Sequence, residues 1–292
     1  MPSLASRIGT QLSDRARACL ESNFRFLVRD NADNVSLYAG IASQDVTAID
    51  DEKFRDFCAS TLDSSFWATW ALADAEPCLL LQLRNDLVDE CSEQRQRGGE
   101  LSWPSESRLF IVAADRGIYE LNSDREREQP FVFRRPNSNT GSMTFPVLAL
   151  QGELVVDARS TRVVFLGTEC LFNRVYCGRV DRQTRMSHAR ALIEGEPARA
   201  PILQRNEKLN PADATAPRML ASIEYKPHMT ALHAEAVVVA RPPPPLIDGR
   251  FEVDGIELRC SSSSHTHAPA GASAYRLAAT ARTRVAAVLA TL

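Results

Sequence analysis

The segment MTFPVLALQGELVVDARSTRVVFLGTECLFNRVYCG (143–178) decides the fold, because apolar runs alternate in it with turn-forming residues. The runs are rich in β-branched and aromatic residues, and Gln151-Gly152 and Ala158-Arg159-Ser160 separate them, as turns separate strands. Such short connections leave no room for the crossover helices that a parallel sheet requires. The segment therefore predicts an antiparallel meander.

The same pattern extends toward the N-terminus, where more short apolar runs follow one another closely. The predicted strands are RLFIVAA (108–114), GIYEL (117–121), PFVFR (130–134), MTFPVLAL (143–150), ELVVDA (153–158), TRVVFLG (161–167) and CLFNRVYCG (170–178). Further along the chain, AEAVVVA (234–240) predicts another strand, and RFEV and IELRC predict a hairpin around Asp254-Gly255. Between these regions, TRMSHARALIEG (184–195) predicts a short helix.

The first hundred residues favour helices, because apolar residues recur there at three- and four-residue spacing. One helix is predicted to begin after a cap at Ser3 or Ser6 and to carry apolar residues from Ile8 to Leu27. A second begins after Asp50-Asp51, and a third follows Pro77 with Leu80, Leu83, Leu87 and Cys91 on its buried side. The second carries an aromatic stripe that we expect to be buried against the sheet: Phe54, Phe57, Phe66 and Trp70.

The predicted fold class is α+β, with a helical N-terminal region packed on an antiparallel β-sheet and a C-terminal helix. We expect an acidic helical region over residues 1–100. A β-rich region over 101–260 follows, with an extended proline-rich arm at about 196–217. Residues 261–292 begin with a Ser/Ala-rich loop, and the Ala-rich segment 274–292 predicts the final helix.

Charge is spread unevenly along a chain whose net charge is only −3. Residues 1–100 carry 10 basic and 17 acidic side chains, a net charge of −7, whereas residues 101–292 carry a net charge of +4. A balance this close to zero argues against a nucleic-acid partner. The acidic N-terminal part and the mildly basic remainder of the chain instead favour a protein partner or head-to-tail self-association.

Only three of the 34 basic residues are lysines: Lys53, Lys208 and Lys226. Two interpretations stay open. A GC-rich genome replaces lysine codons with arginine codons, whereas a viral or secreted effector protein inside a host cell is selected against modifiable lysines. Arginine is also the cation that is enriched at protein interfaces, where lysine is depleted.

The seven cysteines predict reduced thiols rather than disulfides. Their number is odd, no CxxC pair occurs, and the N-terminus lacks the apolar stretch of a signal peptide. No apolar run reaches the roughly 18 residues that span a bilayer. We therefore expect a soluble protein without a membrane partner, in the cytoplasm or another reducing intracellular compartment.

Common catalytic and phosphate-binding motifs are absent from the sequence: GxxxxGK[ST], GxGxxG after a strand, GxSxG and HExxH. Asp157 in ELVVDARSTR matches one carboxylate of a metal-dependent nuclease. However, ELVVD reads as an ordinary amphipathic strand and no paired E-x-K follows. The leading interpretation is accordingly a non-enzymatic binding, accessory or structural assembly protein that needs no cofactor.

The alternative interpretation is an enzyme with an iron site near the C-terminus. His233 and Glu235 form an H-x-E pair at the start of a predicted strand, so both side chains face one side, and His265 or His267 supplies a third ligand. Two histidines and one carboxylate form the face that holds non-haem Fe(II). Over the last sixty residues, this order resembles the iron- and 2-oxoglutarate-dependent dioxygenases. The resemblance implies Fe(II) and 2-oxoglutarate as cofactors, with Arg276 holding a substrate carboxylate.

The same segment also gives a reason for expecting no such site. The run Ser261–Ser264 provides no strand to hold His265, whereas a metal ligand needs rigid support. We therefore expect His233, Glu235 and His265 not to converge on one point. The non-enzymatic binding protein remains the leading interpretation.

Overall fold

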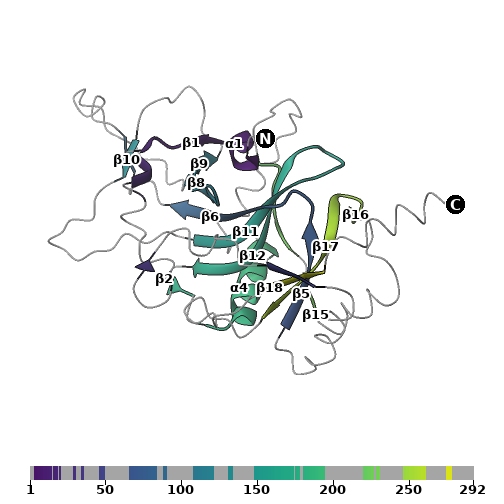
Figure 1. The fold of residues 1–292 in the computed structure, drawn as a ribbon. Helices are drawn as coiled ribbons and strands as arrows, with labels where there is room; N and C mark the ends of the chain where they lie inside the picture. Colours follow the sequence, from purple (N-terminus) through teal and green to yellow (C-terminus); the bar gives the residue numbers. More distant parts are fainter. Residues whose placement is uncertain are drawn as a thin grey trace.

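The computed structural model describes residues 3–14, 16–18, 20, 29–30, 34–35, 46–49, 66–83, 88–90, 108–121, 131–133, 148–173, 175–177, 180–194, 220–226, 228–230, 246–260 and 274–277. Strands predominate among these residues and form two main sheets (Figure 1).

The large sheet has eight strands, and seven of them follow one path across it. In order they are β1 (Gly9–Gln11), β9 (Ile118–Leu121), β8 (Arg108–Ala113), β6 (Glu76–Leu83), β11 (Leu148–Val156), β12 (Val163–Asn173) and β13 (Val175–Tyr176). These seven pair antiparallel with their neighbours, as predicted for β8, β9, β11 and β12. The predicted meander is wrong, because β6 lies between β8 and β11. The eighth, β14 (Ser222–Tyr225), lies parallel to β12.

The second sheet has six strands drawn from distant parts of the chain. Its order is β15 (His228–Thr230), β5 (Phe66–Leu72), β17 (Phe251–Cys260), β18 (Ala274–Leu277) and β4 (Val46–Ile49), and β16 (Leu246–Ile247) pairs with β17. Strands β18 and β4 are parallel. Two small ribbons pair β10 (Phe131–Phe133) with β7 (Val88–Glu90), and β2 (Arg29–Asp30) with β3 (Asn34–Val35).

Apolar side chains cover both faces of the large sheet. Along β6, Cys78 and Leu80 face one core, whereas Leu79 and Leu81 face another. The first core also contains side chains of helices α1 (Leu4–Ile8) and α4 (Arg182–Glu194), and Figure 1 shows α4 beside β12. The second contains Leu12, Ala16 and Leu20. A third core joins β12 to the second sheet through Leu72, Val164, Leu166, Phe251 and Val253.

The predicted helical N-terminal region is wrong, because strands replace two of its helices where the structure describes these segments. Phe66 and Trp70, expected on a helical stripe, lie on β5, and Leu80 and Leu83, expected on the next helix, lie on β6. When a strand is buried on both faces, its apolar run is continuous and has no period that separates it from a helix. The first predicted helix is also interrupted, since β1 begins at Gly9.

Three more expectations are corrected. Residues 274–277, the predicted start of the C-terminal helix, form β18, which is held between β17 and β4. The hairpin expected around Asp254-Gly255 is one continuous strand, β17, with a register shift between Val253 and Gly255. The turn expected at Gln151-Gly152 is a register shift inside β11. In contrast, the turn at 158–160 and the helix predicted over 184–195 are confirmed, the helix as α4.

Several predictions lie outside the described residues. They are the strand 234–240, the arm at about 196–217, residues 278–292 of the C-terminal helix, and the side chains of Phe54 and Phe57.

Three of the seven cysteines, Cys78, Cys170 and Cys177, are buried in the first core. Burial raises the pKa of the Cys78 and Cys170 thiols, so both stay protonated near neutral pH. Cys19, Cys58 and Cys91 lie outside the described residues. None of the described helices is long and apolar enough to cross a membrane.

Candidate functional site

A cleft of about 470 Å³ opens where the chain passes from β14 of the large sheet to β15 of the second sheet. One wall is α4, and the other is formed by residues of β5 and β17 and of the turn before β17. Aromatic side chains on this cleft are Trp70, Tyr225 and Phe251. Charged side chains on it are Arg190, Glu194, Glu224, Lys226, Asp248 and Arg250. Its volume lies within the range of about 300–1,000 Å³ that is typical of ligand pockets.

Helix α4 is fixed to the large sheet by a buried ionic group. Glu169 on β12 binds Arg182 at 2.5 Å and Arg185 at 2.9 Å, and all three side chains are 2–3% exposed. Arg185 also donates to the carbonyl of Val180 at 2.6 Å. At the start of the helix, Asp181 accepts from the Thr184 amide at 2.9 Å, as an N-cap residue does.

This anchoring leaves a polar stripe of α4 along the cleft. Gln183, Ser187, Arg190 and Glu194 lie three or four residues apart and line it. The guanidinium of Arg190 donates to Glu194 at 2.7 Å and lies 5.9 Å from the centroid of the Tyr225 ring. Burial raises the pKa of Tyr225 to about 12, so its hydroxyl stays protonated at neutral pH.

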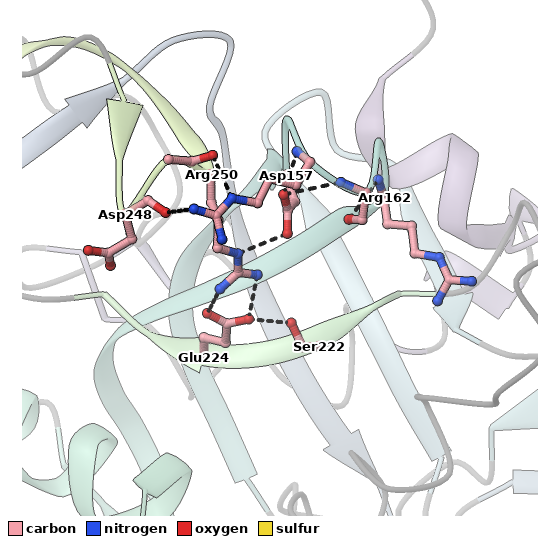
Figure 2. Close-up of polar contacts among 9 residues, drawn as sticks. Asp157, Arg162, Ser222, Glu224, Asp248 and Arg250 are labelled. Atoms are coloured by element: carbon pink, nitrogen blue, oxygen red, sulfur yellow. Dashed lines mark hydrogen bonds and ion pairs between the residues drawn. The ribbon is translucent and has the colours of Figure 1, made fainter.

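The opposite wall is held by a group that we call the Arg250 cluster: Arg250, Asp157, Glu224 and Ser222. Arg250 donates to Glu224 through both terminal nitrogens at 2.9 Å each, and its Nε donates to Asp157 at 2.9 Å. Ser222 donates to Glu224 at 2.6 Å. Figure 2 shows how these contacts join the β11–β12 turn, β14 and the turn before β17. The Arg250 cluster therefore ties the two sheets together at the cleft.

Both carboxylates of the Arg250 cluster are held in the ionised form. Burial raises the pKa of Asp157, but hydrogen bonds from Arg250 and from the amides of Arg159 and Ser160 outweigh it, and the pKa lies below its ordinary value. Burial likewise raises the pKa of Glu224, and hydrogen bonds from Arg250 and Ser222 bring it below the ordinary value. Each carboxylate therefore stabilises the fold in its charged state.

Replacing Arg250 is expected to remove stability that depends on pH. Because the folded-state pKa values of Asp157 and Glu224 are lowered, this stability is complete above their unfolded values of about 3.9 and 4.3 and is lost as pH falls through the folded values. Urea unfolding should show Arg250→Gln less stable by roughly 2 kcal/mol at pH 7, with the difference shrinking between about pH 5 and pH 2.

Arg159→Gln is the matched control, because the Arg159 guanidinium donates to two backbone carbonyls, of Asp248 and Gly249, at 2.7 and 3.0 Å. Its effect on the free energy of unfolding should not vary over the same pH range. A constant difference for Arg250→Gln from pH 7 to pH 2 would contradict the assignment.

A buried ion pair lies next to the cleft. Lys226 follows β14 and pairs with Glu153 of β11, and the lysine side chain is 2% exposed. The Lys226 amide also donates to the carbonyl of Gly167 at 2.9 Å. These contacts fix the point at which the chain leaves the large sheet for β15, and they place Tyr225 and His228 on the cleft.

The structure describes one of the five residues that the oxygenase hypothesis names. His233, Glu235, His265 and His267 lie outside the described residues. Arg276 lies on β18, opposite Glu257 of β17 and Ala48 of β4 in the register of the second sheet. Within the described ranges, no group of three or more histidine, cysteine, aspartate or glutamate side chains is placed to hold a metal ion. The oxygenase hypothesis stays a prediction, which iron analysis of the purified protein can test.

Sequence patterns did not point to the residues of the cleft. Asp157 stood out as a carboxylate after a strand, but its partner Arg250 is 93 positions away. Trp70 was assigned to a helical core stripe, whereas it is partly buried on β5 at the cleft. The turn sequence Ala158-Arg159-Ser160 was one signal for the position of Asp157. The backbone amides of Arg159 and Ser160 donate hydrogen bonds to the Asp157 carboxylate.

Comparison with known proteins assigns no family: no family model and no curated protein matches the chain.

Proposed function

We propose that this protein is a non-enzymatic binding protein, an accessory or assembly factor, and that the cleft receives a segment of a protein partner or of a second copy. The arrangement of side chains in the cleft supports this proposal. Aromatic side chains lie together with exposed charged groups on α4, where Arg190 and Glu194 are 66% and 48% exposed. Interfaces between proteins commonly combine aromatic and arginine side chains with a polar, solvent-accessible rim.

One observation carries the proposal: the cleft is preorganised on both sides. Arg182 and Arg185 fix α4 to the large sheet through Glu169, and the Arg250 cluster fixes the opposite wall. A site whose walls are already held in place costs less conformational entropy when a partner binds. The ionic groups that hold the walls need no partner to be stable, so the cleft persists while it is empty.

Filling the cleft tests the proposal. Ser187 lines the cleft and His188 does not, although both are exposed neighbours on α4. Ser187→Trp is expected to weaken partner binding by about tenfold or more, a loss of roughly 1.4 kcal/mol, because the indole occupies the space of the bound segment. His188→Trp should leave the affinity within about twofold.

The partner is first identified by photo-crosslinking from position 183, which lines the cleft, with position 191 as the exposed control that does not. The purified partner, or the protein itself if it self-associates, is then titrated calorimetrically against each tryptophan variant. Equal affinities for Ser187→Trp and wild type would rule out the cleft as the binding site.

A further inference from the structure

We propose that the cleft is selective for a cationic side chain, an arginine or lysine on the bound segment of the partner protein. This inference rests on the proposed function and specifies the chemistry of the group that enters the cleft. It is carried by three features of the cleft: the charge of its ionic group, the lining carboxylate that lies outside the ion pairs, and the aromatic rings beside its carboxylates.

The charged side chains that line the cleft sum to zero, and the ion-pair partners of its cations make the group as a whole negative. Three carboxylates (Glu194, Glu224, Asp248) and three cations (Arg190, Lys226, Arg250) line it. Two further carboxylates, Glu153 and Asp157, pair with Lys226 and Arg250. With His228 neutral, the group carries a net charge of −2. Including Arg159, which binds the backbone of the same turn, leaves −1.

The cations that line the cleft are already engaged by the protein's own carboxylates. The Nζ of Lys226 is shielded from solvent and paired with Glu153. Arg250 directs three nitrogens to two carboxylates, and Arg190 is paired with Glu194. Glu194 and Glu224 are engaged in the same pairs, so an incoming ion of either sign would compete with them. Among the charges that line the cleft, the Asp248 carboxylate lies outside these pairs.

Asp248 is the carboxylate best placed to meet an incoming cation. It is exposed on the turn before β17, and its backbone carbonyl, not its carboxylate, accepts the hydrogen bond from Arg159. Figure 2 shows its carboxylate pointing away from the Arg250 cluster. Its backbone is in the left-handed region, with φ of 52°, which an asparagine adopts as readily as an aspartate.

The protein already places two of its own guanidinium groups between a carboxylate and an aromatic ring at this cleft. Arg250 binds Glu224 and lies 4.7 Å from the centroid of the Phe251 ring. Arg190 binds Glu194 and lies 5.9 Å from the centroid of Tyr225. Trp70 adds a third ring to the same cleft, and tryptophan is the strongest aromatic partner for a cation. A guanidinium or ammonium from a partner would find the same kind of surroundings.

Matched peptides test the selectivity. Acetyl-Leu-Arg-Leu-amide, acetyl-Leu-Gln-Leu-amide and acetyl-Leu-Glu-Leu-amide are titrated into the ¹⁵N-labelled full-length protein, and backbone amide shifts are followed by NMR. The arginine peptide is expected to shift amides around the cleft, to bind at least about threefold more tightly than the glutamine peptide, and to weaken as salt is raised. The glutamate peptide should bind most weakly of the three.

Two variants separate the charge of Asp248 from its backbone role. Asp248→Asn should reduce the affinity for the arginine peptide by about threefold and leave that for the glutamine peptide unchanged. Asp74→Asn is the control, because Asp74 is exposed, has φ of 53° and lies outside the cleft. It should change neither affinity.

The outcomes distinguish this inference from the proposed function. Two results would overturn the cationic selectivity and leave the binding function standing. In the first, the glutamate peptide binds in the cleft as tightly as the arginine peptide. In the second, no peptide shifts the amides around the cleft, although Ser187→Trp still blocks the partner. If Ser187→Trp leaves partner binding unchanged, the proposed function fails, and the peptide result then describes a cleft that the partner does not use.

Discussion

Glu169→Gln is expected to lower the free energy of unfolding by about 3–5 kcal/mol, because it leaves two arginines buried without their carboxylate. Arg182 and Arg185 contact different oxygens of Glu169, and all three side chains are almost completely buried. Glutamine has nearly the same shape, so no cavity forms. However, its amide carries no negative charge, and its NH₂ group would face a guanidinium that can only donate.

Urea unfolding of the two purified proteins at pH 7 measures the effect. Glu194→Gln is the matched control. It makes the same change in a carboxylate that pairs with another arginine of α4, but the side chains of Arg190 and Glu194 are 66% and 48% exposed, so it should cost less than about 0.5 kcal/mol. A similar small loss for Glu169→Gln would mean that the anchoring of α4 does not depend on this buried group.

Gly152→Ala is expected to cost about 3 kcal/mol, at the upper end of the usual range for overpacking. A Cβ at this position would lie 2.3 Å from the carbonyl oxygen of Leu166 and 2.6 Å from the Phe165 ring. The oxygen belongs to β12, which pairs with β11 on both sides of the register shift, so it cannot move aside without breaking the pairing. The sequence had predicted an exposed turn at Gln151-Gly152, where a methyl group would be tolerated.

Chemical denaturation distinguishes the two arrangements. Ser160→Ala lies in the exposed turn that does connect β11 with β12, and it should change the free energy of unfolding by less than about 0.5 kcal/mol. A loss for Gly152→Ala as small as that of Ser160→Ala would indicate a turn, and with it a different register for β11.

Prediction from sequence succeeded where the signal was local. Strands β8 and β9 and the turn at 158–160 were predicted from alternation and turn residues, and α4 was predicted from its own segment. The single strand β12 was predicted as two strands, 161–167 and 170–178. Prediction failed for β5 and β6, whose burial on both faces removes the period of two that identifies a strand. It also failed where glycine signalled a turn, since Gly152 instead allows β12 to approach closely.

The candidate site was beyond the reach of such patterns. The Arg250 cluster joins residues 26 and 93 positions apart, and the buried group under α4 joins residues 16 positions apart on different elements. Neither group forms a motif of fixed spacing. The sequence drew attention to the histidines near the C-terminus instead, because the H-x-E pair is a local pattern.

The amino-acid sequence by itself determined the antiparallel pairing of β8 with β9 and of β11 with β12, because apolar alternation and turn chemistry act between neighbours in the chain. It also determined the near-neutral net charge of the chain. The tertiary structure alone decided that residues 66–83 are strands, that β14 and β18 lie parallel to β12 and β4, and that a cleft forms between two sheets. These features depend on which distant segments pair and bury one another, and backbone pairing across such distances overrides local helix preference.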